Sequence, residues 1–131
     1  MFEELKDKET KNNQGYIYVL MNEQNYIKIG ITSNPYQRFN SLSGSNTGGV
    51  EIIRYYLSPI MYIGKTIEGI MHRTFKEYRQ SGEWFYGVGL YYEDVINYLD
   101  QLCSTPSFII CNENRKKYIE NQVSKGEKRN E

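Results

Sequence analysis

Two short runs rich in β-branched and aromatic side chains constrain the fold of this chain more than any other feature of its sequence. Residues 16–20 read YIYVL, and residues 26–31 read YIKIGI. Such compositions are typical of β-strands. The polar residues 22–25 between the two runs, NEQN, favour a turn. We therefore predict an antiparallel hairpin as the start of a small sheet.

A short helix and a third strand are expected after this hairpin. Asn34 is suited to cap a helix and Pro35 to begin it. The Gly-rich residues 43–49 are expected to end this helix, and residues 51–57 have the composition of a strand.

The longest helical pattern covers residues 62–79. Its apolar side chains recur at helical spacing and form one stripe: Ile63, Ile67, Ile70, Met71, Phe75 and Tyr78. A short segment at 83–85 and a last helix at 91–102 follow. The predicted fold class is α+β, a small three-stranded antiparallel sheet flanked by helices, with extra helices toward the C-terminus.

The length of 131 residues is that of about one domain. We expect a charged N-terminal extension at 1–14, the domain proper at 15–103 and a C-terminal extension at 104–131. The last segment has few apolar residues, which predicts a short solvated helix around 115–123 and disorder at the end.

Composition excludes several classes of protein. Sixteen Lys and Arg residues balance sixteen Asp and Glu residues, which argues against a histone-like nucleic-acid coat. No apolar run is long enough to span a membrane, and the charged start is unlike a secretory signal. Two cysteines and one histidine are too few for a four-ligand structural zinc site. Free or buried thiols in a reducing cytoplasm are the expectation.

One apparent nucleotide-binding motif fails on its spacing. Gly64-Lys65-Thr66 resembles the end of a phosphate-binding P-loop, but the position that requires the first glycine is Pro59. We therefore expect no nucleotide cofactor.

The hairpin carries a candidate anion site. Tyr18 on the first strand and Lys28 on the second can point to one face, because side chains alternate along a strand. Arg38, in the first turns of the next helix, can reach the same side. A phenol, an ammonium and a guanidinium would together bind an anion. The alternative is a half-buried Tyr18 beside two solvated cations.

The long helix carries a second candidate. Glu68 and His72 share one helix face, where the carboxylate is suited to a hard divalent cation and the imidazole to proton transfer. The alternative is an ordinary surface pair. Glu83 follows in Gly82-Glu83-Trp84-Phe85, whose two aromatic rings we interpret as core packing.

In their order along the chain, these residues resemble the GIY-YIG nuclease superfamily over residues 15–86. Tyr16-Ile17-Tyr18 stands where that family has Gly-Ile-Tyr, and Lys28-Ile29-Gly30 stands where it has Tyr-Ile-Gly. The later positions are similar to the branch common in phage and bacterial proteins: Thr32, Arg38, Glu68, His72 and Gly82-Glu83-Trp84-Phe85. Tyr62-Ile63-Gly64 spells the second motif literally, but it lies too far along the chain to share a hairpin with Tyr18.

The chain departs from the family pattern at several positions. Lys28 replaces the second tyrosine, so a cation stands in place of a hydroxyl, and Tyr16 replaces the first glycine. The usual late asparagine has no clear match, although Glu83 stands nearby.

The resemblance implies a metal-dependent DNA endonuclease. Glu68 would hold a single Mg²⁺ or Mn²⁺, with Glu83 as the alternative ligand. Tyr18 would act as general base or position the water, helped by cations that favour its phenolate. Arg38 would hold the scissile phosphate, and His72 would relay the proton.

Double-stranded DNA is the expected partner, in the cytoplasm of a bacterial or phage-infected cell. The outer side of the long helix would grip its backbone through Arg73, Lys76 and Arg79, or a homodimer would supply a second half-site. Two alternatives stay open: a DNA-binding module that does not cleave, and a protein-interaction domain.

Overall fold

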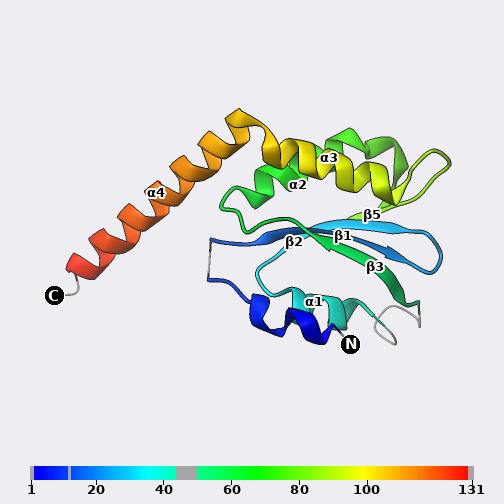
Figure 1. Cartoon of the computed structure of the whole chain (residues 1–131), viewed down its shortest axis with the longest axis horizontal. Coiled ribbons are helices and arrows are strands. Elements are labelled where there is room, and N and C mark those ends of the chain that lie inside the picture. Colours follow the sequence, from blue (N-terminus) through cyan, green and yellow to red (C-terminus); the bar gives the residue numbers. More distant parts are fainter. Residues whose placement is uncertain (1, 12, 44–49, 130–131) are drawn as a thin grey trace.

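The structure is a computed structural model that describes residues 2–11, 13–43 and 50–129, with side chains as far as residue 123. One sheet lies between two groups of helices, and a long helix leads away from this body (Figure 1). The elements follow in the order η1 (Glu3–Lys8), β1 (Tyr16–Asn22), β2 (Ile27–Thr32), α1 (Pro35–Leu42), β3 (Ile52–Leu57), α2 (Gly64–Thr74), η3 (Lys76–Tyr78), β4 (Arg79–Ser81), β5 (Trp84–Phe85), α3 (Tyr92–Ser104) and α4 (Pro106–Arg129).

The sheet has five strands in the order β3-β1-β2-β5-β4, with every pairing antiparallel. The α+β class, the hairpin and the third strand are confirmed, but the prediction of three strands is wrong. The two additional strands, β4 and β5, contain three and two residues. Segments this short carry no readable alternation of polar and apolar residues.

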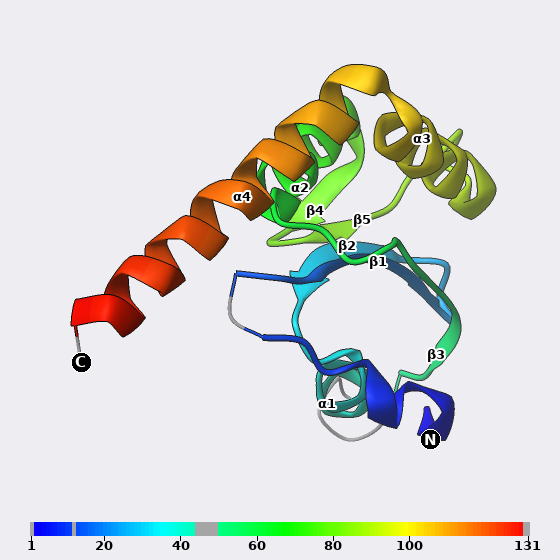
Figure 2. The same cartoon turned by 60° about the vertical axis from the view of Figure 1, so that its left-hand side comes forward.

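Both faces of the central strands are buried, which explains their nearly continuous apolar sequences. Ile17, Val19 and Ile29 belong to the core on the side of α2 and α3. Tyr18 and Leu20 point to the opposite face, into the core covered by α1 and η1. Leu5 of η1 is buried in that second core, so part of the charged N-terminal extension packs on the sheet (Figure 2).

The start of α1 is as predicted. Asn34 caps the helix by accepting a hydrogen bond from the backbone N–H of Gln37 at 3.1 Å, and Pro35 occupies the first turn. The Gly-rich stretch expected to end this helix lies, beyond Ser43, outside the described residues.

The long helix predicted for residues 62–79 is wrong in extent, because α2 covers only Gly64–Thr74. The chain then forms the 3-10 turn η3 and enters β4. Phe75 and Tyr78, the last members of the expected stripe, still pack against the core from these elements. Their burial therefore did not require a continuous helix. The last predicted helix corresponds to α3.

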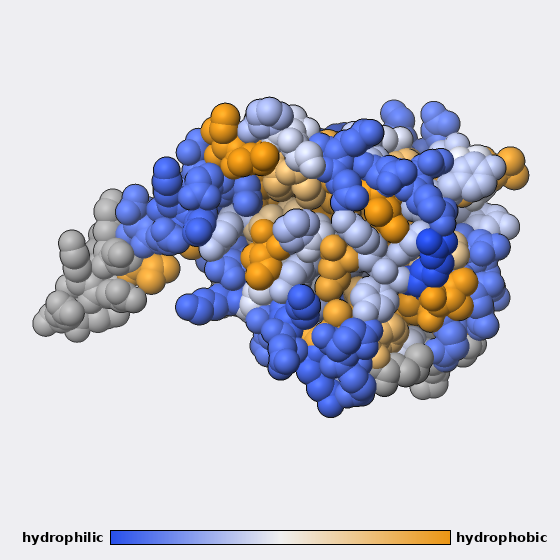
Figure 3. Space-filling model, viewed as in Figure 1, coloured by the Kyte–Doolittle hydropathy of each residue, from blue (hydrophilic) through white to orange (hydrophobic). Residues whose placement is uncertain are grey.

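The C-terminal segment forms one helix, α4, instead of the short helix predicted at 115–123. It begins beside α3 and projects away from the body (Figures 1 and 2). Asn112 attaches its first part by accepting a hydrogen bond of 2.7 Å from the Tyr62 backbone N–H. As far as residue 123, mostly hydrophilic side chains cover its projecting part (Figure 3). None of the described helices combines the length and the apolar character needed to cross a bilayer.

Candidate active site

Tyr18 lies in the middle of the hairpin and packs directly on Gly30 of the neighbouring strand. The two residues are paired across β1 and β2, and the Tyr18 side chain has no exposed surface. A Cβ atom added to Gly30 would lie 2.4 Å from the Tyr18 hydroxyl oxygen and 2.5 Å from Cζ. The Phe39 ring of α1 packs edge-on at a centroid distance of 5.4 Å. Glycine at position 30 is therefore what allows the tyrosine ring to occupy this place.

Arg38 reaches the same hydroxyl from α1. Its Nε donates a hydrogen bond of 3.4 Å to Tyr18 Oη, which is long for such a bond. The side chain is exposed, and no other hydrogen bond to its guanidinium is formed within the part of the chain that the structure describes. The remaining N–H groups of Arg38 are thus available to an anion.

Burial raises the pKa of Tyr18 to about 12, and the hydrogen bond from Arg38 lowers it by less. The expectation that neighbouring cations would favour the phenolate is therefore wrong, because loss of hydration penalises the charged form more. Tyr18 is a neutral phenol at pH 7. The charges of Glu83 and Glu68 raise this pKa as well, by less than burial does.

Lys28 is a buried cation on the same sheet face as Tyr18. Only 6% of the residue is exposed. Its ammonium lies 3.4 Å from a carboxylate oxygen of Glu83 and 5.0 Å from the centroid of the Trp84 ring. Burial lowers the pKa of Lys28, and the charge of Glu83 opposes this shift. The ion pair with Glu83 offsets part of the desolvation free energy of the buried ammonium.

Glu68 faces this group from α2. Its Oε2 is buried and has no hydrogen-bond partner among the described residues. Burial and, second, the charge of Glu83 raise the pKa of Glu68. A buried carboxylate with a free oxygen beside a second carboxylate suits Mg²⁺ or Mn²⁺, which often take one or two carboxylates and keep several waters. The described residues contain no group of three or more His, Cys, Asp or Glu side chains that could hold a metal.

His72 joins α2 to the edge of β2. Its Nε2 lies 2.8 Å from the carbonyl oxygen of Ile29, and its ring packs edge-on against Phe85 at 5.1 Å. Because a carbonyl only accepts, Nε2 carries the hydrogen and Nδ1 is the nitrogen left for proton transfer. The backbone N–H of Ile29 meanwhile donates to the Glu83 carbonyl. His72 thus contacts the backbone of β2 at Ile29, directly after the residues of β2 that pair with β5.

The three cations predicted to grip DNA do not share one helix. Arg73 lies in α2, Lys76 in η3 and Arg79 in β4, and all three are exposed. Arg79 Nε donates to the Gly82 carbonyl at 2.7 Å. The prediction of a single basic helix face is therefore wrong, because α2 ends at Thr74.

Trp84 is the residue that sequence reasoning missed. We interpreted both aromatics of β5 as core packing, and this is confirmed: Phe85 is fully buried, and Trp84 packs against the core that contains Tyr18. Trp84 is only half-buried, lies under the Lys28 ammonium and lines a pocket. The pairing of Lys28 with Trp84 across β2 and β5 brings this about, and such a register is not readable from sequence.

The literal Tyr62-Ile63-Gly64 lies outside the hairpin. Gly64 is the first residue of α2, and Ile63 precedes it without a capping side chain. An added Cβ on Gly64 would meet Ile31 Cδ1 at 2.3 Å, so this glycine serves the packing of α2 against β2.

The family model of the T5orf172 domain matches residues 15–103, about two thirds of the chain. The chain belongs to the T5orf172 domain family. This is a nuclease-related family. No curated protein and no solved structure matches the chain.

The T5orf172 match contains every member of the hairpin cluster. Tyr18, Lys28, Arg38, Glu68 and Glu83 all fall within it, whereas η1 and α4 lie outside. The residues that converge in space thus belong to the part of the chain that defines the family.

Proposed function

We propose that this T5orf172 domain is a metal-dependent DNA endonuclease of the GIY-YIG type, which hydrolyses phosphodiester bonds. The observation that carries the proposal is one cluster at the hairpin, with a neutral phenol, two cations and two carboxylates: Tyr18, Lys28, Arg38, Glu68 and Glu83. The membership in a nuclease-related family supports the same chemistry.

Hydrolysis adds water across a P–O bond and increases negative charge on the phosphoryl oxygens and on the leaving oxygen. The N–H groups of Arg38 that have no partner among the described residues, together with the ammonium of Lys28, would bind the phosphoryl oxygens. The neutral hydroxyl of Tyr18 would orient the attacking water, since its pKa of about 12 makes it a poor base at pH 7. Nδ1 of His72 is the nitrogen proposed to accept a proton.

Glu68, with Glu83 as second or alternative ligand, would hold one Mg²⁺ or Mn²⁺ ion. Such an ion, when bound, offsets the charge that develops on the leaving oxygen. The Oε2 atom of Glu68, which has no partner within the described ranges, supports this role, because a buried carboxylate oxygen without a partner is costly.

Binding of double-stranded DNA is assigned to this face and to the exposed cations Arg73, Lys76 and Arg79. These would contact phosphates without reading the sequence. A second half-site supplied by a homodimer is the alternative arrangement.

One observation favours a second candidate, a DNA-binding module that does not cleave. The Tyr18 side chain is fully buried, so its hydroxyl must first become accessible to water, and a movement of Arg38, which contacts the hydroxyl, would provide that access. The Arg38 bond is long and the side chain is exposed, which makes this movement easy. Because Arg38 can move in this way, the burial of Tyr18 does not exclude cleavage, and we prefer the endonuclease.

The test is cleavage of supercoiled plasmid by the purified chain in Mg²⁺ or Mn²⁺. We expect Glu68→Gln and Tyr18→Phe each to lower the rate at least a hundredfold, because one removes a metal ligand and the other the orienting hydroxyl. Glu77→Gln, a charge change at an exposed residue of η3, is the matched control and should leave the rate unchanged.

The outcomes separate the candidate functions. Cleavage that survives both site substitutions would reject this site. Salt-sensitive DNA binding without cleavage in any divalent metal would favour the non-cleaving module. Absence of DNA binding at every salt concentration would favour the protein-interaction domain.

A further inference from the structure

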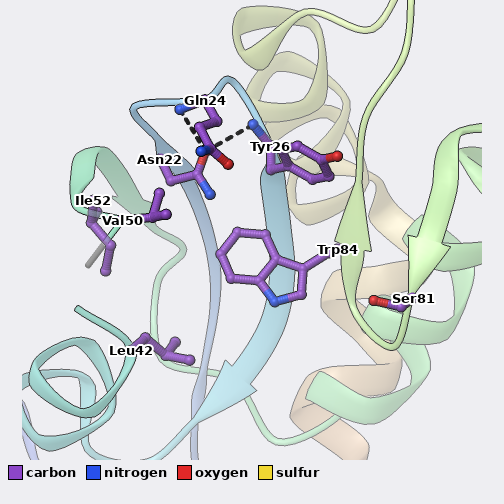
Figure 4. A pocket seen from close by; sticks show the side chains of 8 residues that line it. All are labelled: Asn22, Gln24, Tyr26, Leu42, Val50, Ile52, Ser81 and Trp84. Atoms are coloured by element: carbon purple, nitrogen blue, oxygen red, sulfur yellow. Dashed lines mark hydrogen bonds between the residues drawn. The ribbon is translucent and has the colours of Figure 1, made fainter. Parts of the chain in front are cut away.

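A pocket of about 500 Å³ opens beside the candidate active site. It lies between the β1–β2 turn, the start of β3 and the strands β4 and β5. Figure 4 shows the Trp84 ring face-on in its middle, with Ser81 on one side and Ile52 on the other. Trp84 is also the residue under the Lys28 ammonium. The pocket and the proposed phosphate-binding cations therefore share one wall.

The pocket combines apolar walls with amide groups and has no charged side chain among its described lining residues. Asn22 is 9% exposed, and its Oδ1 accepts backbone hydrogen bonds from Gln24 at 2.9 Å and Tyr26 at 3.0 Å. These two bonds fix the amide orientation and leave its NH₂ group without a partner among the described residues. Figure 4 shows that this nitrogen points toward the Trp84 ring.

These features match the chemistry of a nucleobase. A base has broad faces that stack on aromatic rings and an edge of hydrogen-bond donors and acceptors. Trp84 supplies the ring, and the Asn22 NH₂ and the exposed Gln24 amide supply groups for the edge. An uncharged pocket does not favour the phosphate of a nucleotide, whereas Lys28 next to it does.

We propose that this pocket binds one nucleobase of the DNA strand, next to the phosphate held at Lys28. The proposal rests on the proposed function and extends it, because a bound base would position the scissile phosphate and give the enzyme a preference for one base. A base in this pocket must be unpaired, either in a single strand or flipped out of a duplex.

The single tryptophan of the chain makes this stacking directly measurable. We would titrate the Glu68→Gln protein, which we expect to cut DNA at least a hundredfold more slowly, with a 12-mer of thymidine and with an abasic 12-mer of the same charge. The expected result is quenching of Trp84 fluorescence by the thymidine strand and at least fivefold weaker quenching by the abasic strand. Free thymidine separates binding of a base alone from binding of a strand, and should require a concentration at least a hundredfold higher.

A pocket variant gives an independent measure. Ser81→Leu places a larger side chain at the exposed rim and should weaken binding of the thymidine strand about fivefold to tenfold, measured by anisotropy of labelled DNA. Ser107→Leu makes the same change at an exposed site on α4, remote from the pocket, and should have no effect. Unchanged melting temperatures show that both variants are folded.

Equal quenching by both strands, or DNA bound without quenching, would overturn the base pocket while leaving the endonuclease intact. Free thymidine binding as tightly as the strand would also overturn it, in favour of a nucleoside site. DNA that neither binds nor is cleaved would reject the proposed function itself.

Discussion

The contact between Tyr18 and Gly30 leads to a prediction in which the effect of one substitution on the free energy of unfolding changes sign with the residue at position 18. In Gly30→Ala, the new methyl carbon would lie 2.4 Å from the Tyr18 hydroxyl oxygen, whereas ordinary contacts begin at 3.4 Å. The ring must therefore move by about 1 Å. It is buried on all sides, so we expect overpacking to cost about 1–3 kcal/mol. Alanine is preferred to glycine in a strand by roughly 0.5–1 kcal/mol, which offsets part of this cost.

In a Tyr18→Leu background the clashing atoms of the phenol ring are absent, so only the strand preference remains. Gly30→Ala should then stabilise the fold by roughly 0.5–1 kcal/mol. Urea unfolding of the four proteins, followed by Trp84 fluorescence and circular dichroism, gives a coupling energy that we expect to be about 2 kcal/mol.

Gly69→Ala is the matched control for this cycle. Gly69 lies within α2, and its added Cβ would meet only the flexible end of Arg73, at 3.3 Å. It should stabilise the protein by up to about 1 kcal/mol in both backgrounds. If Gly30→Ala cost the same free energy with and without the Tyr18 ring, the packing argument would be refuted.

Three further predictions concern single residues. Burial raises the pKa of Tyr18 from about 10 to about 12, so the contribution of the neutral phenol to the free energy of unfolding is complete below pH 10 and is lost as the pH rises toward 12. Tyr18→Phe should therefore reduce the loss of stability at alkaline pH, measured by urea unfolding. An identical pH profile for both proteins would contradict the burial. The raised pKa of Glu68 means that the folded state disfavours the ionised carboxylate. Glu68→Gln should therefore raise the melting temperature at pH 7, where the carboxylate is ionised in the unfolded chain, but not at pH 4. Equal shifts of the melting temperature at both pH values would count against this reasoning. Asn34→Ala removes the cap of α1 and should cost about 1 kcal/mol in thermal unfolding; a neutral result would show that the cap is dispensable.

Sequence reasoning succeeded where the signal is local. The β1–β2 hairpin, the Asn34 cap and α3 each depend on residues within one short segment. It failed for β4 and β5, which form only because β2 offers an open edge for Phe85 and Trp84. It also failed for α4, since an exposed helix requires no apolar stripe.

The same distinction applies to the candidate site, where the placement of residues was predictable from local sequence and the electrostatics were not. Alternation along the strands was enough to place Tyr18 and Lys28 on one sheet face, and the register agrees with that placement. The electrostatics were not predictable, because they depend on how deeply α1 covers Tyr18. The resemblance implies a Tyr18 phenolate favoured by nearby cations, whereas Phe39 and the strands remove the hydration that a phenolate needs.

The zero net charge of the chain is repeated within the site. Two cations, Lys28 and Arg38, face two carboxylates, Glu68 and Glu83, so the formal charge of the cluster is zero when all four are ionised. A cluster of this kind attracts a phosphate only weakly, because the carboxylates repel what the cations bind. A divalent cation on the carboxylates would leave an excess of two positive charges. We therefore expect metal binding to determine the affinity for phosphate as well as the rate of the chemical step. A protein without a net positive charge depends more on a bound metal to attract phosphate than a basic protein does.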